Sequence, residues 1–357
     1  IGPPARGDIP EASVDFKARS PFRLVHRGDV LARLVPAVEG QLGSNVLGEA
    51  IPFGKTEVKA LQPGANTQLI GEALVAQKDG HFVLRDELIT VHEVLEIAGD
   101  VDYRTGHVDF PGDVLIHGEI KRGFHVKAKG SVYCARVIDA TLVECQGDLV
   151  TEQGILGRGT GSVRVGGGVT ARFIENCLVE AQGSIRVRTG CLNSVLRSLD
   201  KVTTGAKGVL VGGKIYAQEG IQAGQVGSPT SPRTELICGI NAFAQQKLLW
   251  IRDKNMALAA RLKQVQARMT SDPSSKSRLQ DVHDRLLAAI HKLNEAAQEL
   301  MKELDKNEKA FVQVQGMIYP GSYIEICHIP FVVTETLSGV RFSLDKRKGK
   351  IVLDPLL

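Results

Sequence analysis

The sequence predicts a mainly β protein with an α-helical insertion. We expect a parallel β-helix carrying an antiparallel coiled-coil hairpin, preceded by a small β-rich N-terminal module. Three observations predict this fold. A glycine-led motif recurs every 16 to 20 residues between residues 99 and 240. Apolar residues alternate with period two inside each repeat, and the period becomes helical over residues 241–310.

The recurring motif is a glycine, then a small or acidic residue, then an aliphatic residue. Its copies begin at Gly112, Gly130, Gly147, Gly167 and Gly183, with a degraded copy at Leu199-Asp200-Lys201-Val202. This spacing fits one coil of a parallel β-helix and is too short for a propeller blade or a helical repeat. Glycine suits the corners because it enters positive-φ conformations without strain. The alternative is a β-sandwich with glycine-rich turns, but such turns recur every ~8–12 residues.

The segments on either side of the repeats predict the remaining domains. Short strands are expected at 22–25, 30–34 and 81–84, and further strands follow residue 310. We therefore predict an N-terminal module at 1–98 and a β-helix at 99–240 plus 311–357. The hairpin is predicted at 241–310.

Two apolar stripes with steps of three and four residues predict the hairpin. The first comprises Leu248, Ile251, Leu258, Leu262, Val265 and Met269, and the second Leu279, Leu286, Ile290, Leu293, Leu300 and Leu304. Between them Pro273 interrupts the helical pattern. Asn255 falls on the first stripe, where a buried amide would fix the register of the two helices. The alternative is a bundle folded back on the β-domain.

Composition narrows the function classes. The net charge is only +4 over 357 residues, so the charge balance does not indicate nucleic acid or an anionic membrane as a binding partner. No apolar run approaches the ~20 residues that span a bilayer, so no membrane insertion is expected. The six cysteines form no CxxC pair and lie mostly in strand-like contexts, where Cys packs as a small hydrophobe. We expect a reduced, cytoplasmic protein.

Catalytic chemistry is not expected. No histidine lies between His125 and His283, which argues against an acyltransferase with a histidine base beside its solenoid groove. The one dense acidic group is Asp100, Asp102, Asp109 and Asp113. These residues adjoin glycines at predicted corners, so turn formation is favoured over catalysis, and cation binding stays open. We expect no catalytic residue, metal or cofactor.

Five residues are candidates for contact with a partner. Glu175 and Asn176 lie between apolar flanks and are interpreted as a polar corner stack, a partner contact or a solvated turn. His283 and His291 lie eight apart on the second helix, at the edge of its stripe rather than in a metal site. Asn255 completes the set.

A further pattern is spread over six segments, namely residues 99–110, 112–118, 123–130, 173–176, 208–215 and the late Ile318-Tyr319-Pro320-Gly321. Together these segments are similar to the flagellar assembly protein A family, long catalogued as a domain of unknown function. The resemblance implies a right-handed β-helix with a coiled-coil insertion. Two departures stand out: the coil at Asp200 lacks its glycine, and the family's usual N-terminal domain looks truncated or absent.

The resemblance also implies a function. We expect a non-enzymatic cytoplasmic scaffold or regulatory protein of flagellar assembly or placement, located at a cell pole. It would act through protein contacts of the β-helix and the coiled coil. The expected partners are proteins of the flagellar or polar machinery, a sugar-phosphotransferase carrier protein, or a second copy. The alternative is a carbohydrate-active or transferase-type enzyme on a β-helix scaffold.

Overall fold

The computed structural model describes residues 17, 20–35, 38, 40–54, 61–139, 142–230, 232–271, 276–304 and 307–356. The chain divides into two compact units, Ile1–Gly147 and Asp148–Leu357.

The first unit begins with short strands. These are β1 (Leu24–Val25), β2 (Val30–Arg33), β3 (Gly43–Ser44), β4 (Ala50–Ile51), β5 (Gln62–Pro63), β6 (Thr67–Ile70), β7 (Ala73–Ala76), β8 (Gly80–Arg85) and β9 (Leu88–His92). They form a sheet in the order β1-β8-β9-β5, a sheet in the order β2-β7-β6, and the pair β3-β4. Asp86 and Glu87 both have positive φ and form the tight turn between β8 and β9. The predicted β-rich character of this part is confirmed.

The remainder of the first unit is a parallel solenoid. Its strands are β10 (Val94–Ile97), β11 (Val108–Phe110), β12 (Asp113–Ile116), β13 (His125–Ala128), β14 (Val132–Cys134) and β15 (Leu142–Cys145). Strands pair in parallel with their counterparts one coil away, so inward side chains stack in buried columns. One column is Leu95, Val114 and Val132, and a second is Val108, Val126 and Val143. Isolated bridges through Val101, Ile120 and Ile138 form a third.

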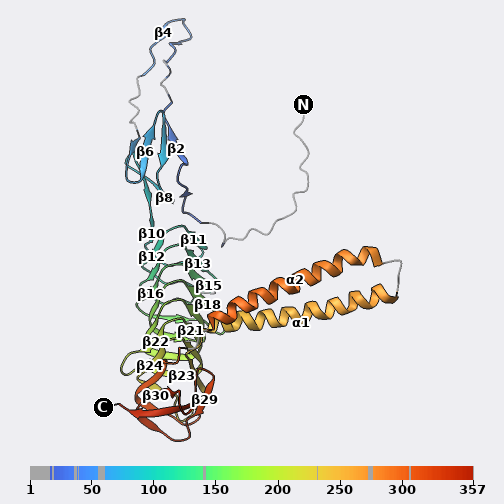
Figure 1. Cartoon of the computed structure of the whole chain (residues 1–357). Helices are drawn as coiled ribbons and strands as arrows, with labels where there is room; N and C mark the ends of the chain where they lie inside the picture. Colours follow the sequence, from blue (N-terminus) through green and yellow to red (C-terminus); the bar gives the residue numbers. More distant parts are fainter. Residues whose placement is uncertain are drawn as a thin grey trace. The chain divides into compact units, whose positions relative to one another are not determined.

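The second unit also consists of parallel strands stacked in coils (Figure 1). Its parallel strands are β16 (Leu149–Thr151), β17 (Gly154–Leu156), β18 (Ser162–Val165), β19 (Val169–Glu175), β20 (Leu178–Ala181), β21 (Ile185–Ser198), β22 (Lys201–Thr204), β23 (Val209–Ala217), β24 (Gly220–Ala223), β25 (Gln225–Val226) and β26 (Thr234–Cys238). Ile185 pairs with Val169 and with Val202, the aliphatic residue of the degraded repeat. Parallel ladders of this kind exclude the β-sandwich.

Contacts between neighbouring coils explain the glycine motif. The Asp113 carboxylate accepts a 2.7 Å hydrogen bond from the Ser131 backbone N–H in the next coil. A Cβ at Gly130 would collide with this carboxylate and lie 2.8 Å from the backbone carbon of Gly112. Asp148 repeats the arrangement, accepting from the Gly168 N–H at 2.7 Å. The acidic residue therefore joins two coils, and the glycine leaves room for it.

The helices are inserted between adjacent coils. The helices are α1 (Ala242–Ser271) and α2 (Lys276–Glu303). Asn241 caps α1, since its side-chain oxygen accepts from the Phe243 and Ala244 N–H groups at 3.1 and 3.0 Å. The chain returns in β27 (Phe311–Ile318), which pairs in parallel with β24. The ends of the insertion meet where the Asn307 N–H donates to the Gly239 carbonyl at 2.9 Å.

Strand β28 (Tyr323–Ile326) still pairs in parallel with β26, and antiparallel strands follow it. They are β29 (Ile329–Val332), β30 (Leu337–Asp345) and β31 (Lys350–Pro355). β30 pairs with β27 and β31, and β29 pairs with β28. These pairings cover strand edges that would otherwise stay open to another chain.

Candidate interaction surface

The two helices pack against each other along the predicted stripes. Ala244, Ile251 and Leu300 form a buried cluster, and Leu248 and Leu293 pack against it. Every described side chain of both predicted stripes is buried or half-buried. Residues early in α1 meet residues late in α2, so the helices run antiparallel. The antiparallel pair is thus observed, while supercoiling as a coiled coil stays a prediction.

Asn255 lies on this seam as predicted. Its Nδ2 donates to Asn294 Oδ1 at 2.8 Å, whereas its own Oδ1 is buried without a hydrogen-bond partner. The amide pair joins the helices at one register.

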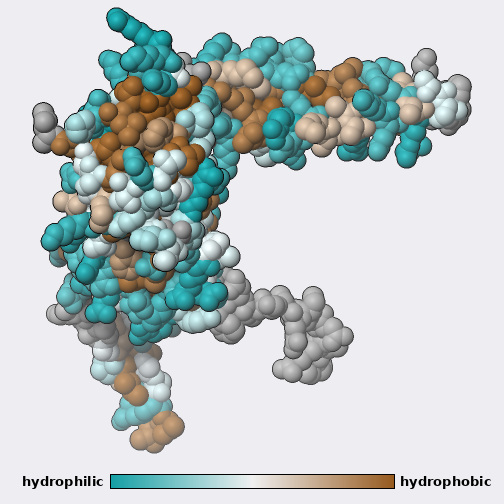
Figure 2. All heavy atoms as spheres, turned by 90° about the horizontal axis from the view of Figure 1, so that it is seen from below, coloured by the Kyte–Doolittle hydropathy of each residue, from teal (hydrophilic) through white to brown (hydrophobic). Residues whose placement is uncertain are grey.

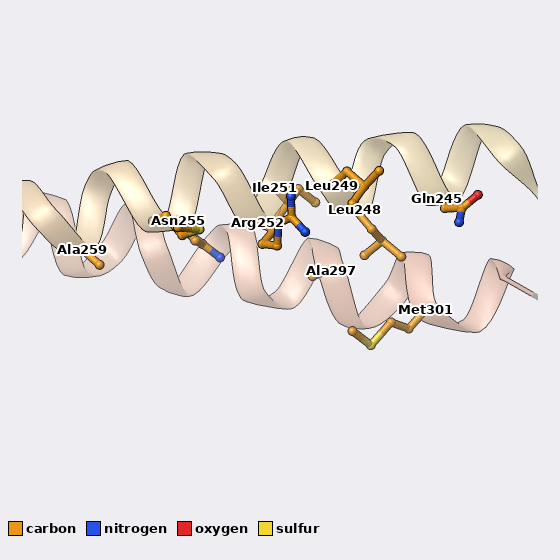
Figure 3. A pocket seen from close by; sticks show the side chains of 10 residues that line it. Gln245, Leu248, Leu249, Ile251, Arg252, Asn255, Ala259, Ala297 and Met301 are labelled. Carbon is orange, nitrogen blue, oxygen red and sulfur yellow. The ribbon is translucent and has the colours of Figure 1, made fainter.

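A groove of about 630 Å³ runs beside the seam; we call it the α1 groove (Figure 3). It is lined by Gln245, Leu248, Leu249, Ile251, Arg252, Asn255, Met256 and Ala259 from α1, and by Ala297 and Met301 from α2. Seven of these ten residues are apolar, and Arg252 is the one charged lining residue.

The α1 groove is open to solvent. Leu249 is 47% exposed, Met256 66% and Met301 62%, whereas Ile251 behind them is 2% exposed. Apolar side chains also stand out among polar ones along the helix pair in Figure 2. A contiguous exposed apolar surface rimmed by polar residues is typical of a protein interaction site.

The two candidate histidines lie away from the groove lining. His283 is mostly covered and contacts Gln266 at 3.3 Å and Asp284 at 3.0 Å. His291 is 75% exposed and lies 3.3 Å from Glu295, one helical turn on. Their contact with a partner stays a prediction.

Glu175 and Asn176 form part of a stacked corner of the solenoid. Asn176 and Asn193 have φ of 48° and 46°, and Gly212 follows at 65°. The strand register places these left-handed residues in successive coils. Asparagine tolerates this conformation better than most residues, which accounts for its presence at the corner. No hydrogen bond or ion pair among the described residues joins Glu175 or Asn176 to the helices. Their role as partner contacts stays a prediction.

The acidic group of the first coils forms internal contacts. Asp100 accepts from the Glu119 N–H at 3.0 Å and lies 2.8 Å from Lys121 Nζ. The Lys121 hydrogen bond, followed by that from Glu119, lowers the pKa of Asp100 below its ordinary 3.8. Asp102 and Asp113 likewise accept from backbone N–H groups. In the described part of the chain, no group of three or more His, Cys, Asp or Glu side chains could hold a metal ion.

The cysteines fill the core, as predicted. All six are buried as thiols. Burial raises the pKa of the Cys134 thiol to about 11 and those of Cys177 and Cys191 to about 12. These thiols are protonated, and hence poor nucleophiles, at neutral pH.

Comparison with known families identifies the chain's relatives. The family model described as the Flagellar Assembly Protein A beta solenoid domain matches residues 93–351, and that of the N-terminal region matches residues 4–87. The chain belongs to the flagellar assembly protein A family. The N-terminal match corrects the expectation that the family's N-terminal domain is absent. Comparisons with curated proteins and with solved structures give no match.

Membership of the flagellar assembly protein A family implies a role related to flagellar assembly and confirms the predicted resemblance. Neither described helix is long and apolar enough to span a membrane.

The exposed side chains Leu249, Met256 and Met301 were missed by the sequence reasoning. A second pattern in the sequence of α1 could have indicated them. It has the same steps of four and three as the seam and comprises Gln245, Leu249, Arg252, Met256 and Ala259.

Proposed function

We propose that this chain is a non-enzymatic scaffold or regulatory protein of flagellar assembly or placement, acting through protein contacts of its solenoid and helix pair. The α1 groove is the observation that carries this proposal within a family tied to flagellar assembly. Covering Leu249, Met256 and Met301 removes apolar surface from water, which favours association.

The solenoid supports this role by anchoring the helices. Strands pair on both sides of the insertion, and the Asn307–Gly239 hydrogen bond holds its two ends together. We propose a right-handed β-helix, the hand that parallel crossover connections favour, and a supercoiled hairpin. We retain the division into 1–98, 99–240 plus 311–357, and 241–310. A cytoplasmic location at a cell pole belongs to the same proposal.

Proteins of the flagellar or polar machinery are the proposed partners. A sugar-phosphotransferase carrier protein and a second copy are further candidates.

The enzyme alternative has one observation in its favour. Thr90 Oγ1 lies 3.0 Å from His92 Nε2 in a cavity that also contains His81 and Glu96. A hydroxyl nucleophile requires a base that a third group orients. Among the described residues, no such group contacts the other ring nitrogen of His92. The scaffold is therefore the better-supported function.

Deletion of the helix pair tests the proposal. Because the ends of the insertion meet at Gly239 and Asn307, a short Gly/Ser linker can replace residues 241–306 without breaking a coil. We expect a folded β-protein by circular dichroism and cells with fewer or misplaced flagella. Normal flagella in cells that contain the deletion protein at native abundance would refute the role of the helices.

A further inference from the structure

A small cavity opens on the outer face of the solenoid in the second unit; we call it the arginine pocket. Its volume is about 230 Å³, and its polar lining comprises Arg186, Arg188, Thr151, Thr170, Thr203 and Thr204. None of the described residues that line it is acidic. Sites for drug-sized ligands usually measure about 300–1,000 Å³, so this pocket suits a small ion or the charged end of a larger ligand.

The two arginines of the pocket face outward from the same strand, β21. Val187 between them is 1% exposed and points into the core. Because side chains alternate across a strand, Arg186 and Arg188 share its outer face, where both are exposed. Among the described residues, neither guanidinium has an ion pair or a hydrogen bond with the protein. Two positive charges in one pocket thus lack a protein counter-charge.

Elsewhere the parallel ladders of the solenoid neutralise basic side chains. Arg164 and Arg197 lie in register with Glu180 and contact it at 3.3 and 2.7 Å. Lys214 lies in register with Glu235 and contacts it at 3.0 Å. Each of these bases therefore meets a glutamate in a neighbouring coil.

Arg186 has a threonine on each side instead of a glutamate. Its register partners are Thr170 in the preceding coil and Thr203 in the following one. Neither hydroxyl has a hydrogen bond with the described part of the protein. Thr204 differs, because its Oγ1 accepts from the Gly224 N–H at 3.0 Å. The pocket therefore presents a guanidinium between two available hydroxyls, with a second guanidinium on the same face.

This set of donors favours a phosphate group as the ligand. The planar fork of arginine matches both carboxylate and phosphate oxygens. The donors, however, are spread over three strands about 4.8 Å apart, and a tetrahedral phosphate can accept from several directions, whereas a carboxylate has two oxygens in one plane. Two guanidinium charges also match the charge of a phosphate monoester, about −1.5 to −2 at neutral pH.

We propose that the arginine pocket binds the phosphate group of a phosphate monoester, held by Arg186 and Arg188 and oriented by the hydroxyls of Thr170 and Thr203. This ligand is additional to the protein contacts proposed for the α1 groove. Because both guanidinium groups are exposed, salt screens them and the affinity falls as ionic strength rises.

Isothermal titration calorimetry of the full chain at neutral pH and constant ionic strength tests the proposal. The probes are inorganic phosphate and glycerol 3-phosphate, with acetate as the carboxylate control. We expect both phosphates to bind at least tenfold more tightly than acetate. Arg186→Gln/Arg188→Gln should weaken phosphate binding at least tenfold. Arg261→Gln/Arg268→Gln, which removes two exposed charges from α1, should leave it unchanged.

A designed carboxylate gives an independent test of the same pocket. Thr203→Glu places a glutamate in register with Arg186, as Glu180 is with Arg197. Its carboxylate should occupy the guanidinium and weaken phosphate binding at least tenfold, whereas the uncharged Thr203→Gln should weaken it less than about threefold. Circular dichroism checks that every variant is folded.

Vesicle sedimentation distinguishes the two sources of a phosphate monoester. Phosphatidylcholine vesicles with one fifth phosphatidic acid carry it as a lipid headgroup, and pure phosphatidylcholine vesicles are the control. Binding of glycerol 3-phosphate alone assigns a soluble ligand, whereas additional vesicle binding that requires Arg186 assigns a lipid headgroup.

Three results would overturn the inference: no binding of inorganic phosphate, equally tight binding of acetate, or unchanged phosphate binding in folded Arg186→Gln/Arg188→Gln. Deletion of the helix pair leaves Arg186 and Arg188 in place, so any of these results would leave the proposed role of the helices standing.

Discussion

The Asn255 side-chain amide donates a 2.8 Å hydrogen bond to Asn294 Oδ1, from one helix of the pair to the other. The Oδ1 of Asn255 is buried without a partner. A buried polar atom without a hydrogen bond costs about 1–3 kcal/mol, so this contact is better suited to fixing register than to adding stability.

Replacing both amides should therefore stabilise the pair. We expect the double variant Asn255→Leu/Asn294→Leu to raise the free energy of unfolding by about 1 kcal/mol, as measured by urea denaturation. Gln298→Leu, on the exposed surface of α2, serves as the control and should have little effect. A less stable double variant would show that the amide pair is a net stabilising contact.

The glycines of the repeat should not be equivalent. Gly130→Ala places a Cβ against Asp113 and the Gly112 backbone, so we expect a loss of at least about 2 kcal/mol in thermal or urea unfolding. Gly99→Ala meets nothing within 4 Å and should cost less than about 1 kcal/mol. Equal losses in the two variants would contradict the explanation of the motif.

Acid should weaken the first unit partly through Asp100. The Lys121 hydrogen bond, then that from the Glu119 N–H, lowers the pKa of this carboxyl in the folded state below 3.8. Its stabilising effect is therefore complete above the unfolded-state pKa and is lost as pH falls through the lower folded-state value. Between pH 5 and pH 2, the wild type should lose more stability than Asp100→Asn. Identical pH profiles of the unfolding midpoint would reject this role.

The buried thiols should react only after unfolding. Because burial raises the pKa of Cys134 to about 11 and those of Cys177 and Cys191 to about 12, a thiol reagent such as DTNB should label the native protein slowly at pH 8. In guanidinium, all six cysteines should react rapidly. Rapid labelling of the native protein would show that the coils open readily.

The sequence predicted those features that repeat along the chain. The spacing of Gly112, Gly130 and Gly147 predicted the coils, and the three-four stripes through Ile251 and Leu300 predicted the packed helices. Contacts between coils could not be predicted from the spacing of the repeats. The reach of Asp113 to the Ser131 N–H depends on coil stacking, which composition and spacing do not specify.

The candidate surface was harder to predict than the fold. Exposed hydrophobic residues such as Leu249 and Met256 are common singly on protein surfaces and are not distinctive in sequence. They become a candidate site only when α2 places Met301 across the groove. The solenoid's third side was also missed, since isolated bridges at Val101, Ile120 and Ile138 leave no alternating pattern.

The central claim is that the α1 groove is used in flagellar assembly. The most direct measurement is the number and position of flagella, by electron microscopy, in cells whose chromosomal copy carries Leu249→Gln/Met256→Gln. Leu287→Gln is the matched control, and protein abundance is checked in both strains. The account predicts markedly fewer or misplaced flagella in the groove variant and normal flagella in the control. Normal flagella in the groove variant, with the protein at native abundance, would contradict it.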